Sequence, residues 1–377
     1  MTTMRTWKKK WAVWLAVALA CLGLHYLVMV LCRFIMNGGF SLQGFADMFW
    51  QRLTEPGDAP RYLDLAENGY VTEGENRINL VFYPLYPLLV RGLSYLTGSL
   101  PVAGIVVSQV CYAVSSVLLY ELILMDADAR CAWDGALLMA LYPFSTFVMG
   151  VFSEGLFLML TIGALYALRR DRMPAAGIIG FLAALSRTQG MLLFFPAVYQ
   201  WIRRCFLEKD GRSPKFTDLF LLLIPLGFFA YLCINHHLYG DWFKFLQYEE
   251  APPWYQSTQW VGRNIAQHYS MAVEYGGLGY VIYYVQIALF FVILGVLIYG
   301  VWKKESMMYL LYGGVYLGFS YLSGWMISGG RYMLGCVPVF IILAKQRDGL
   351  PRRLILAVSA LLFFAYSLFF YKAYAIM

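Results

Sequence analysis

Long apolar runs separated by short polar stretches are the feature that most constrains how this chain folds. A membrane-spanning helix needs about 20 apolar residues, and hydrophobic residues make up 60% of the 377-residue chain. A soluble protein of this length could not solvate that composition. We therefore expect one all-α polytopic membrane domain over residues 1–377. Its eleven expected spans are 11–34, 100–124, 133–150, 152–168, 174–187, 188–203, 216–238, 279–302, 306–325, 331–345 and 352–375.

The run at 79–98 is ambiguous because Pro84, Pro87 and Arg91 interrupt it. If this run does not cross the membrane, 19 of the 29 Lys and Arg residues fall on one side, together with the N-terminus. The positive-inside rule then predicts a multi-pass cell-membrane protein with a cytoplasmic N-terminus and an external C-terminus. The first apolar run is too long for a cleaved signal peptide, so it predicts a retained helix.

Composition argues against several other classes of protein. The net charge of +7 comes from residues between apolar runs, which favours a role in orientation over nucleic-acid binding. The seven cysteines form no CxxC pair, and the four histidines lack zinc-ligand spacing. We therefore expect no metal, no other cofactor and no nucleic-acid partner.

This topology leaves two large external loops, which offer the only room for a polar site. The first covers residues 35–99 and includes a short helix that begins near Ala59 and stops at Gly69. The second covers residues 239–278 and is rich in aromatic residues. Its Trp242, Trp254, Tyr255 and Trp260 could stack on a sugar or form an interfacial belt.

Four polar clusters fall at membrane boundaries, and the predicted topology places all of them on the external side. Two of them supply acids and two supply arginines. They are Asp58 with Glu67, Ser153 with Glu154, the segment from Ser186 to Gly190 that includes Arg187 and Gln189, and Arg331 with Tyr332.

Each cluster also has a purely structural explanation. Arg187 and Arg331 could be helix-end anchors whose charged heads reach water. Glu154 could be an acid stabilised at a helix N-terminus, and Asp58 could cap the helix that follows it. Taken jointly, two acids and two arginines on one membrane face fit better as a site.

Glycosyl transfer from a lipid phosphate is the chemistry that these residues fit. A hydroxyl acceptor needs a carboxylate to take its proton, and a departing phosphate needs arginines. The lipid tail needs a groove between helices, and no nucleotide-sugar domain is visible. The alternative is a lipid or glycan transporter or flippase, which would favour two repeated halves with polar residues near the midplane. We find no repeat, and the polar clusters lie at one face.

The stretches DAPRYLDLAENGY and FYPLYPLL resemble the first-loop signature of the PIG-V type mannosyltransferases and their bacterial relatives. The resemblance continues in order through Pro143, Phe147, the Ser153–Glu154 pair, the segment 187–190, the Arg331–Tyr332 pair and Pro338. It implies a GT-C fold, a polyprenyl-phosphate sugar donor, typically of mannose, and an active site on the external face. The acceptor would be a hydroxyl group of a lipid- or glycan-linked molecule. Membrane lipids would be the other partners.

The resemblance also implies roles for individual residues. Asp58 would be the catalytic base, and the substrate-binding residues would be Glu67, Glu154, Arg187, Gln189, Arg331 and Tyr332. The chain departs from the family pattern at Gly57, where a Trp is usual, at Thr188 and Gln189, which replace Ser and Asn, and at the acidic Asp64. These differences concern sugar and acceptor specificity more than reaction class.

Overall fold

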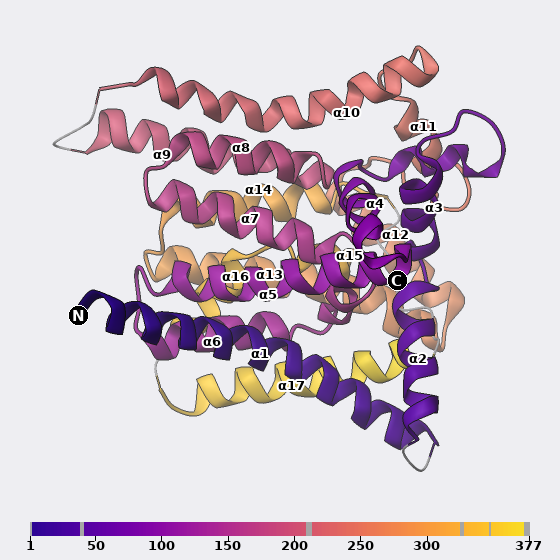
Figure 1. The fold of residues 1–377 in the computed structure, drawn as a ribbon, viewed down its shortest axis with the longest axis horizontal. Helices are drawn as coiled ribbons and strands as arrows, with labels where there is room; N and C mark the ends of the chain where they lie inside the picture. The colour runs from indigo at the N-terminus through magenta and orange to yellow at the C-terminus, as the bar shows by residue number, and fades with distance from the viewer. Residues whose placement is uncertain (1, 38–40, 209–212, 325–327, 347, 373–377) are drawn as a thin grey trace.

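The computed structural model describes residues 2–37, 41–208, 213–324, 328–346 and 348–372. These residues form a bundle of helices with no strand, as the sequence predicts (Figure 1). Five helical segments are long and apolar enough to cross a membrane. They are Lys10–Met36 within α1 (Thr2–Asn37), α5 (Leu100–Ile123), η5 with α10 (Phe216–Leu222 and Leu223–Tyr239), Gly279–Trp302 within α13 (Leu278–Trp302), and α17 (Leu350–Tyr371).

The other predicted spans are occupied by shorter helices, most of them interrupted. At a rise of about 1.5 Å per residue, a helix of 12 residues covers well under the ~30 Å of a hydrocarbon core. Non-helical backbone at this depth is tolerated when protein surrounds it. The segments are α6 (Ala129–Ala140), η2 (Ser145–Met149), α7 (Glu154–Arg169), α8 (Met173–Ala184), η3 (Thr188–Leu193), α9 (Phe194–Ile202), η4 (Arg203–Leu207), α14 (Met307–Ser320), α15 (Gly329–Met333) and α16 (Pro338–Ala344).

Helix α7 lies at the centre of the bundle, between α5 and α8, and most of its side chains are buried. A close approach to α5 depends on Gly155. A Cβ atom at this position would lie 2.4 Å from the carbonyl oxygen of Ser108, so a larger residue would push the helices apart. Small residues serve the same purpose at other membrane helix contacts. The packing therefore fixes the first turn of α7, which begins at Glu154.

The helices of both predicted external loops gather at one end of the bundle, opposite the N-terminus (Figure 1). Helix α4 has 13 residues and lies among these helices, while the prediction that residues 79–98 do not span stays a prediction. These helices are α2 (Leu42–Thr54), α3 (Ala59–Asn68), η1 (Glu75–Val81), α4 (Leu85–Thr97), α11 (Lys244–Glu250) and α12 (Val261–Tyr275).

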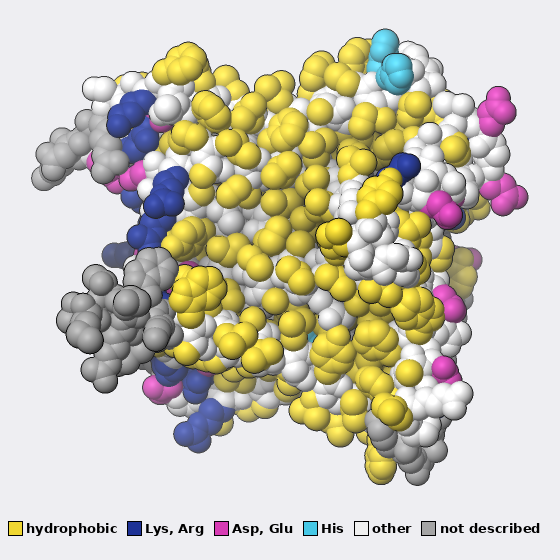
Figure 2. Space-filling view, viewed as in Figure 1, with side chains coloured by type: hydrophobic (Ala, Val, Ile, Leu, Met, Phe, Trp, Pro, Cys, Tyr) yellow, Lys and Arg dark blue, Asp and Glu magenta, His cyan; other side chains and the backbone are white. Residues whose placement is uncertain are grey.

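The two ends of the bundle differ in charge. Figure 2 shows a broad apolar band with Lys and Arg side chains gathered at the left end, near the N-terminus. Most of the Asp and Glu side chains visible on this face lie at the opposite end, over the external-loop helices. This asymmetry is the three-dimensional form of the charge pattern from which the topology was predicted.

Asp64 holds the first loop together. Its Oδ1 accepts hydrogen bonds from the side-chain amides of Asn68 and Asn76, at 2.9 and 2.8 Å, and its Oδ2 accepts one from Asn79 at 2.8 Å. Asn79 also accepts a hydrogen bond from Arg61 at 2.9 Å. One carboxylate thus joins η1 to α3, which gives this acid a structural role.

We expect Asp64→Ala to lower the thermal stability of the purified protein in detergent, because three amide donors lose a charged acceptor. Hydrogen bonds to charged groups are worth about 1.5–3 kcal/mol each when buried, and less at this partly exposed position. The matched control is Glu73→Ala, an exposed acid of the same loop with no partner among the described residues. Equal melting temperatures for the two variants would contradict the role given to Asp64.

Candidate active site

Asp58 occupies the N-cap position of α3 without capping it. Its backbone is helical, at φ −82° and ψ −10°, and its side chain makes no hydrogen bond to the helix. The preceding Gly57 has a φ of +57°, a conformation that a Trp would adopt only with strain. The Asp58 Oδ2 instead accepts a hydrogen bond from the Arg331 Nη1 at 2.6 Å. The simple capping explanation of this aspartate therefore does not hold.

Arg331 joins Asp58 to Glu154. Its side chain is buried, its Nε donates to the Glu154 Oε1, and its Nη1 binds Asp58. The guanidinium also lies 4.8 Å and 5.0 Å from the ring centroids of Phe147 and Phe152. A planar guanidinium can bind two carboxylates and stack on aromatic rings at once, which a lysine cannot do.

Arg187 reaches the same Glu154 oxygen from the opposite side. Its Nη2 donates to the Glu154 Oε1 at 2.6 Å, and its Nε donates to the Ser153 Oγ at 3.0 Å. The turn that carries Arg187 packs tightly against α8, where a Cβ atom on Gly190 would lie 2.2 Å from the carbonyl carbon of Ala183. The glycine of this motif is thus required by space.

Two carboxylates and two guanidiniums therefore form one neutral cluster. The side chains of Glu154 and Arg331 are 2% and 5% exposed, Arg187 is 11% exposed, and Asp58 is 24% exposed. Pairing of opposite charges offsets the desolvation penalty of burial, which would be very large for an isolated charge. Exposure rises toward Asp58, so a molecule from outside meets this carboxylate first.

The second external loop covers this cluster through two side chains. The Gln256 Nε2 donates to the Tyr332 Oη at 3.5 Å, and the Arg187 guanidinium lies 5.7 Å from the Tyr332 ring centroid. The Trp254 ring packs edge-on against Phe82 at 5.9 Å. The loop backbone is anchored nearby, where Thr258 pairs with Ser323.

The structure distinguishes the tryptophans of this loop. Trp254 is partly buried, with the Arg61 guanidinium 4.9 Å from its ring centroid. Trp242 stacks on His236 at 4.3 Å, on the end of α10, and Trp260 is 75% exposed. Only Trp254 of these three packs against side chains that adjoin the cluster.

Two predicted site residues lie apart from the cluster. Glu67 is exposed, and neither an ion pair nor a side-chain hydrogen bond joins it to any described residue. It follows Asp58 by nine residues, about 2.5 helical turns, so the two side chains leave α3 on opposite faces. Gln189 is partly buried, close to Arg187 in sequence, with no side-chain hydrogen bond in the described ranges.

The sequence interpretation missed Tyr62 and Glu249. The Tyr62 Oη shares a hydrogen bond of 2.9 Å with the Ser153 Oγ, and burial raises the Tyr62 pKa to about 12. Tyr62 is one turn after Asp58 on α3, a spacing that could have revealed it.

Burial, aided by the charge of Glu250, raises the pKa of Glu249 to about 7. No sequence pattern marks Glu249, because its burial depends on how α11 packs.

In the part of the chain that the structure describes, no group of three or more His, Cys, Asp or Glu side chains is arranged to hold a metal ion. The candidate site is thus built from an ion-paired cluster, hydroxyl groups and aromatic rings.

Comparison with known proteins identifies the family. The mannosyltransferase (PIG-V) family matches residues 36–322. The chain belongs to this family. GPI alpha-1,6-mannosyltransferase 2 of Rattus norvegicus is 34% identical over 149 residues, which cover 36% of this chain and 29% of the relative. The Homo sapiens protein of that name is 30% identical over 198 residues, which cover 46% of this chain and 39% of the relative.

The chain thus spans well under half the length of these PIG-V relatives. No solved structure matches it. The matched family range contains Asp58, Glu154 and Arg187 but ends before Arg331. The structure connects Arg331 to the family range through its contacts with Asp58 and Glu154.

We expect Arg331→Lys to impair both stability and turnover, although the charge is kept. A single ammonium cannot reproduce the two directed hydrogen bonds and the ring contacts of the guanidinium. The loss of one charge-assisted hydrogen bond costs about 1.5–3 kcal/mol. Thermal unfolding and glycosyl transfer by the purified variant are the measurements.

The matched control is Arg203→Lys. Arg203 forms an exposed ion pair with Glu208 at 2.9 Å, which should tolerate the change. Wild-type stability and turnover in Arg331→Lys would mean that Arg331 only anchors a helix end.

Proposed function

We propose that this protein is a membrane mannosyltransferase. It transfers mannose from a polyprenyl-phosphate donor to a hydroxyl of a lipid- or glycan-linked acceptor at the external face. Membership of the PIG-V mannosyltransferase family supports the sugar. The observation that carries the proposal is the buried neutral cluster whose most exposed member is the carboxylate of Asp58.

Asp58 is the proposed base. Arg331 holds its Oδ2, while its Oδ1 has no hydrogen-bond partner among the described residues. The held oxygen fixes the direction of the carboxylate, and the other oxygen is available to accept the proton of the acceptor hydroxyl. Transfer then breaks the bond between the sugar and the phosphate and leaves a polyprenyl phosphate.

Arg187 is the proposed partner of the departing phosphate. Its Nε and Nη2 are bound to Ser153 and Glu154, but its Nη1 has no partner in the described ranges. The Arg331 Nε and Nη1 are bound to carboxylates, and its Nη2 is buried without a hydrogen-bond partner among the described residues. We therefore assign Arg331 mainly to positioning Asp58, and Arg187 to stabilising negative charge that develops on the phosphate.

The remaining predicted residues have weaker support. Glu154 and Tyr332 lie within the cluster or against it, where they can orient substrate hydroxyls directly or through the two arginines. Gln189 follows Arg187 by two residues, so we propose that it contacts the same substrate. Glu67 is proposed only as an outer contact for an acceptor, because it points away from Asp58.

A transporter or flippase is the alternative from another class. Such proteins place their binding site near the midplane, where both sides can reach it in turn. Here the cluster is formed where α3 and α15 meet the first turn of α7, toward the end of the bundle that carries the external loops (Figure 1). A site at one end favours chemistry on a substrate that stays on that side.

The direct test is an assay of purified protein in lipid nanodiscs with synthetic mannosyl-phosphoryl-polyprenol. A lipid extract of the native membrane supplies candidate acceptors. We expect labelled mannose to appear in the acceptor fraction and free polyprenyl phosphate to accumulate with it. Movement of the intact donor across a bilayer, without cleavage, would support the transporter instead.

We expect Asp58→Asn to abolish turnover in a folded protein. Asn still accepts a hydrogen bond from Arg331, so most of the local geometry should persist, but the basic oxygen is lost. Loss of a general base typically costs about 100- to 10,000-fold in rate. Turnover, melting temperature and donor binding should be measured together, because loss of the carboxylate charge can also weaken the cluster.

Glu73→Gln is the matched control, since it removes the charge of an exposed carboxylate in the same loop. It should retain turnover within about twofold, as surface substitutions usually do. Retained turnover in Asp58→Asn would remove the central residue of the proposal.

We expect the acidic end of the bundle to face outward. Glu75 is exposed in η1 and Lys303 is exposed at the opposite end of the bundle. In intact cells, an impermeant maleimide should label Glu75→Cys and should label Lys303→Cys only after the membrane is opened. The unsubstituted protein reports the background from its native cysteines, and the reverse pattern would invert the topology.

A further inference from the structure

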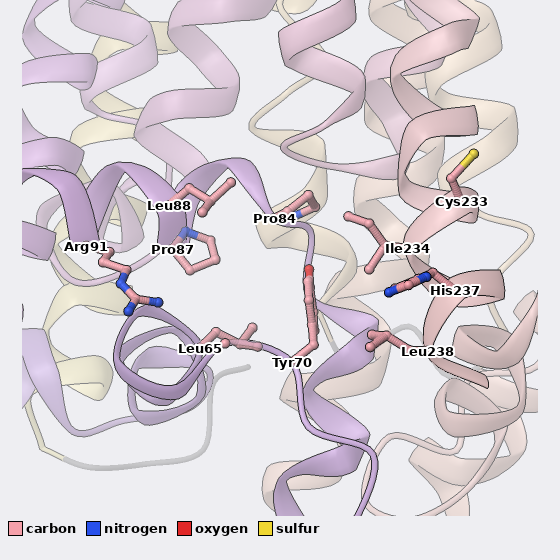
Figure 3. Close-up of a pocket in the computed structure, with 11 residues that line it drawn as sticks. Leu65, Tyr70, Pro84, Pro87, Leu88, Arg91, Cys233, Ile234, His237 and Leu238 are labelled. Carbon is pink, nitrogen blue, oxygen red and sulfur yellow. The ribbon is translucent and has the colours of Figure 1, made fainter.

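An apolar groove lies on the membrane-facing side of the first external loop (Figure 3). It encloses about 510 Å³, within the range of roughly 300–1,000 Å³ that is usual for ligand pockets. One wall comes from α3 and α4, and the other from the last turns of α10. The lining residues are Leu65, Gly69, Tyr70, Pro84, Pro87, Leu88, Arg91, Cys233, Ile234, His237 and Leu238.

The groove opens at the surface of the bundle, at the end that carries the helices of the predicted external loops. Leu88 is 61% exposed on one wall, and Cys233 is exposed on the other. Helix α10 ends at Tyr239, so His237 and Leu238 lie in its last turn and Cys233 lies about one turn deeper. Because Phe216–Tyr239 is a candidate membrane span, a groove along its last turns would extend from the interface into the hydrocarbon layer.

Apart from Arg91 and His237, the residues that line the groove offer almost no hydrogen-bonding groups to a ligand. Pro84 and Pro87 have no backbone N–H. The Tyr70 Oη donates to the Phe82 carbonyl at 2.6 Å, so Tyr70 turns its ring rather than a free hydroxyl to its surroundings. Such a surface suits a hydrocarbon chain and disfavours a sugar.

A series of contacting side chains connects the groove to the ion-paired cluster. On the far side of Tyr70, Phe82 contacts Tyr62, with ring centroids 4.9 Å apart. The neighbouring Tyr83 shares a hydrogen bond of 2.8 Å with Thr188, the residue that follows Arg187. A lipid held in the groove thus has its outer end close to the proposed phosphate-binding arginine.

The rim of the groove carries positive charge. The Arg91 guanidinium has no hydrogen-bond or ion-pair partner among the described residues, and it extends from α4 on one side of the groove (Figure 3). His237 extends from α10 on the other side. An unpaired arginine at the outer interface complements a lipid whose head is an anionic phosphate.

We propose that this groove binds the isoprenoid tail of the polyprenyl-phosphate donor, with Arg91 drawing the phosphate to the rim as the lipid enters. The proposal rests on the proposed function for the identity of the donor. The groove then selects donors by tail length, whereas the cluster acts on the sugar and the phosphate. It follows that the tail and the reacting groups can be perturbed separately.

The decisive variant is Leu88→Trp, which fills the groove from an exposed position that does not support the fold. Its matched control is Leu89→Trp on the same helix, 40% exposed and outside the groove lining. Two donors are compared in nanodiscs, the mannosyl phosphates of citronellol and of a long polyprenol. The measured quantities are KM and kcat for each donor.

We expect Leu88→Trp to raise the KM for the long-chain donor by about tenfold, the effect of displacing only two methylene groups. The citronellyl donor, whose tail is too short to depend on the groove, should change by less than about twofold. Leu89→Trp should change neither. If transfer continues and neither variant changes the KM for one donor more than for the other, the groove holds only bulk lipid. The inference is then wrong, although the proposed function stands.

A second measurement keeps the inference testable if the wild-type protein transfers from neither donor. A polyprenyl phosphate that carries a diazirine in its tail should label residues of the groove, with peptides containing Leu88 or Cys233 recovered by mass spectrometry. Leu88→Trp should reduce this labelling, and Leu89→Trp should not. Labelling spread evenly over the lipid-facing helices would overturn the assignment.

Discussion

The arrangement of the site depends on one buried guanidinium. Arg331 binds Asp58, which precedes it by 273 residues, and Glu154, which precedes it by 177. Its two hydrogen bonds fasten the start of α3, the start of α7 and α15 to one another. A buried charge without partners would be prohibitively costly, so each of the three segments is held where the pairing is complete. Arg187 completes the set, because it pairs with Glu154 and thereby balances the two acids.

This pairing explains why helices are broken near the site. A continuous membrane helix satisfies all of its own backbone groups, whereas a helix end leaves backbone groups free and lets the chain change direction beside a charged residue. Arg187 stands just before η3, Glu154 opens α7, and Arg331 lies in the five-residue α15. Each of these charged residues therefore lies at an interruption or at a helix end. The helices α5, α7 and α8, which pack against one another, hold these ends in place.

The sequence predicted the fold class and singled out the four charged residues of the cluster for different physical reasons. Apolar runs and basic loops reflect local constraints of the membrane, so the helical bundle and the charge asymmetry between its ends could be anticipated. Asp58, Glu154, Arg187 and Arg331 stood out because charge at a membrane boundary is rare. Which of them touch could not be read from spacing, since contacts such as Arg331 with Asp58 depend on tertiary packing.

A neutral cluster also limits how the donor can bind. The phosphate of a lipid-linked sugar carries negative charge, and Glu154 already occupies the inner edge of both arginines. The phosphate therefore has to bind the open Nη1 of Arg187, reach the unpaired Nη2 of Arg331 or compete with Glu154. In either case the attraction is much weaker than that of two free arginines, because the cluster has no net charge. If the donor is a polyprenyl-phosphate sugar, as proposed, its affinity must then come largely from the lipid, which gives the proposed tail-binding groove a central part in recognising it.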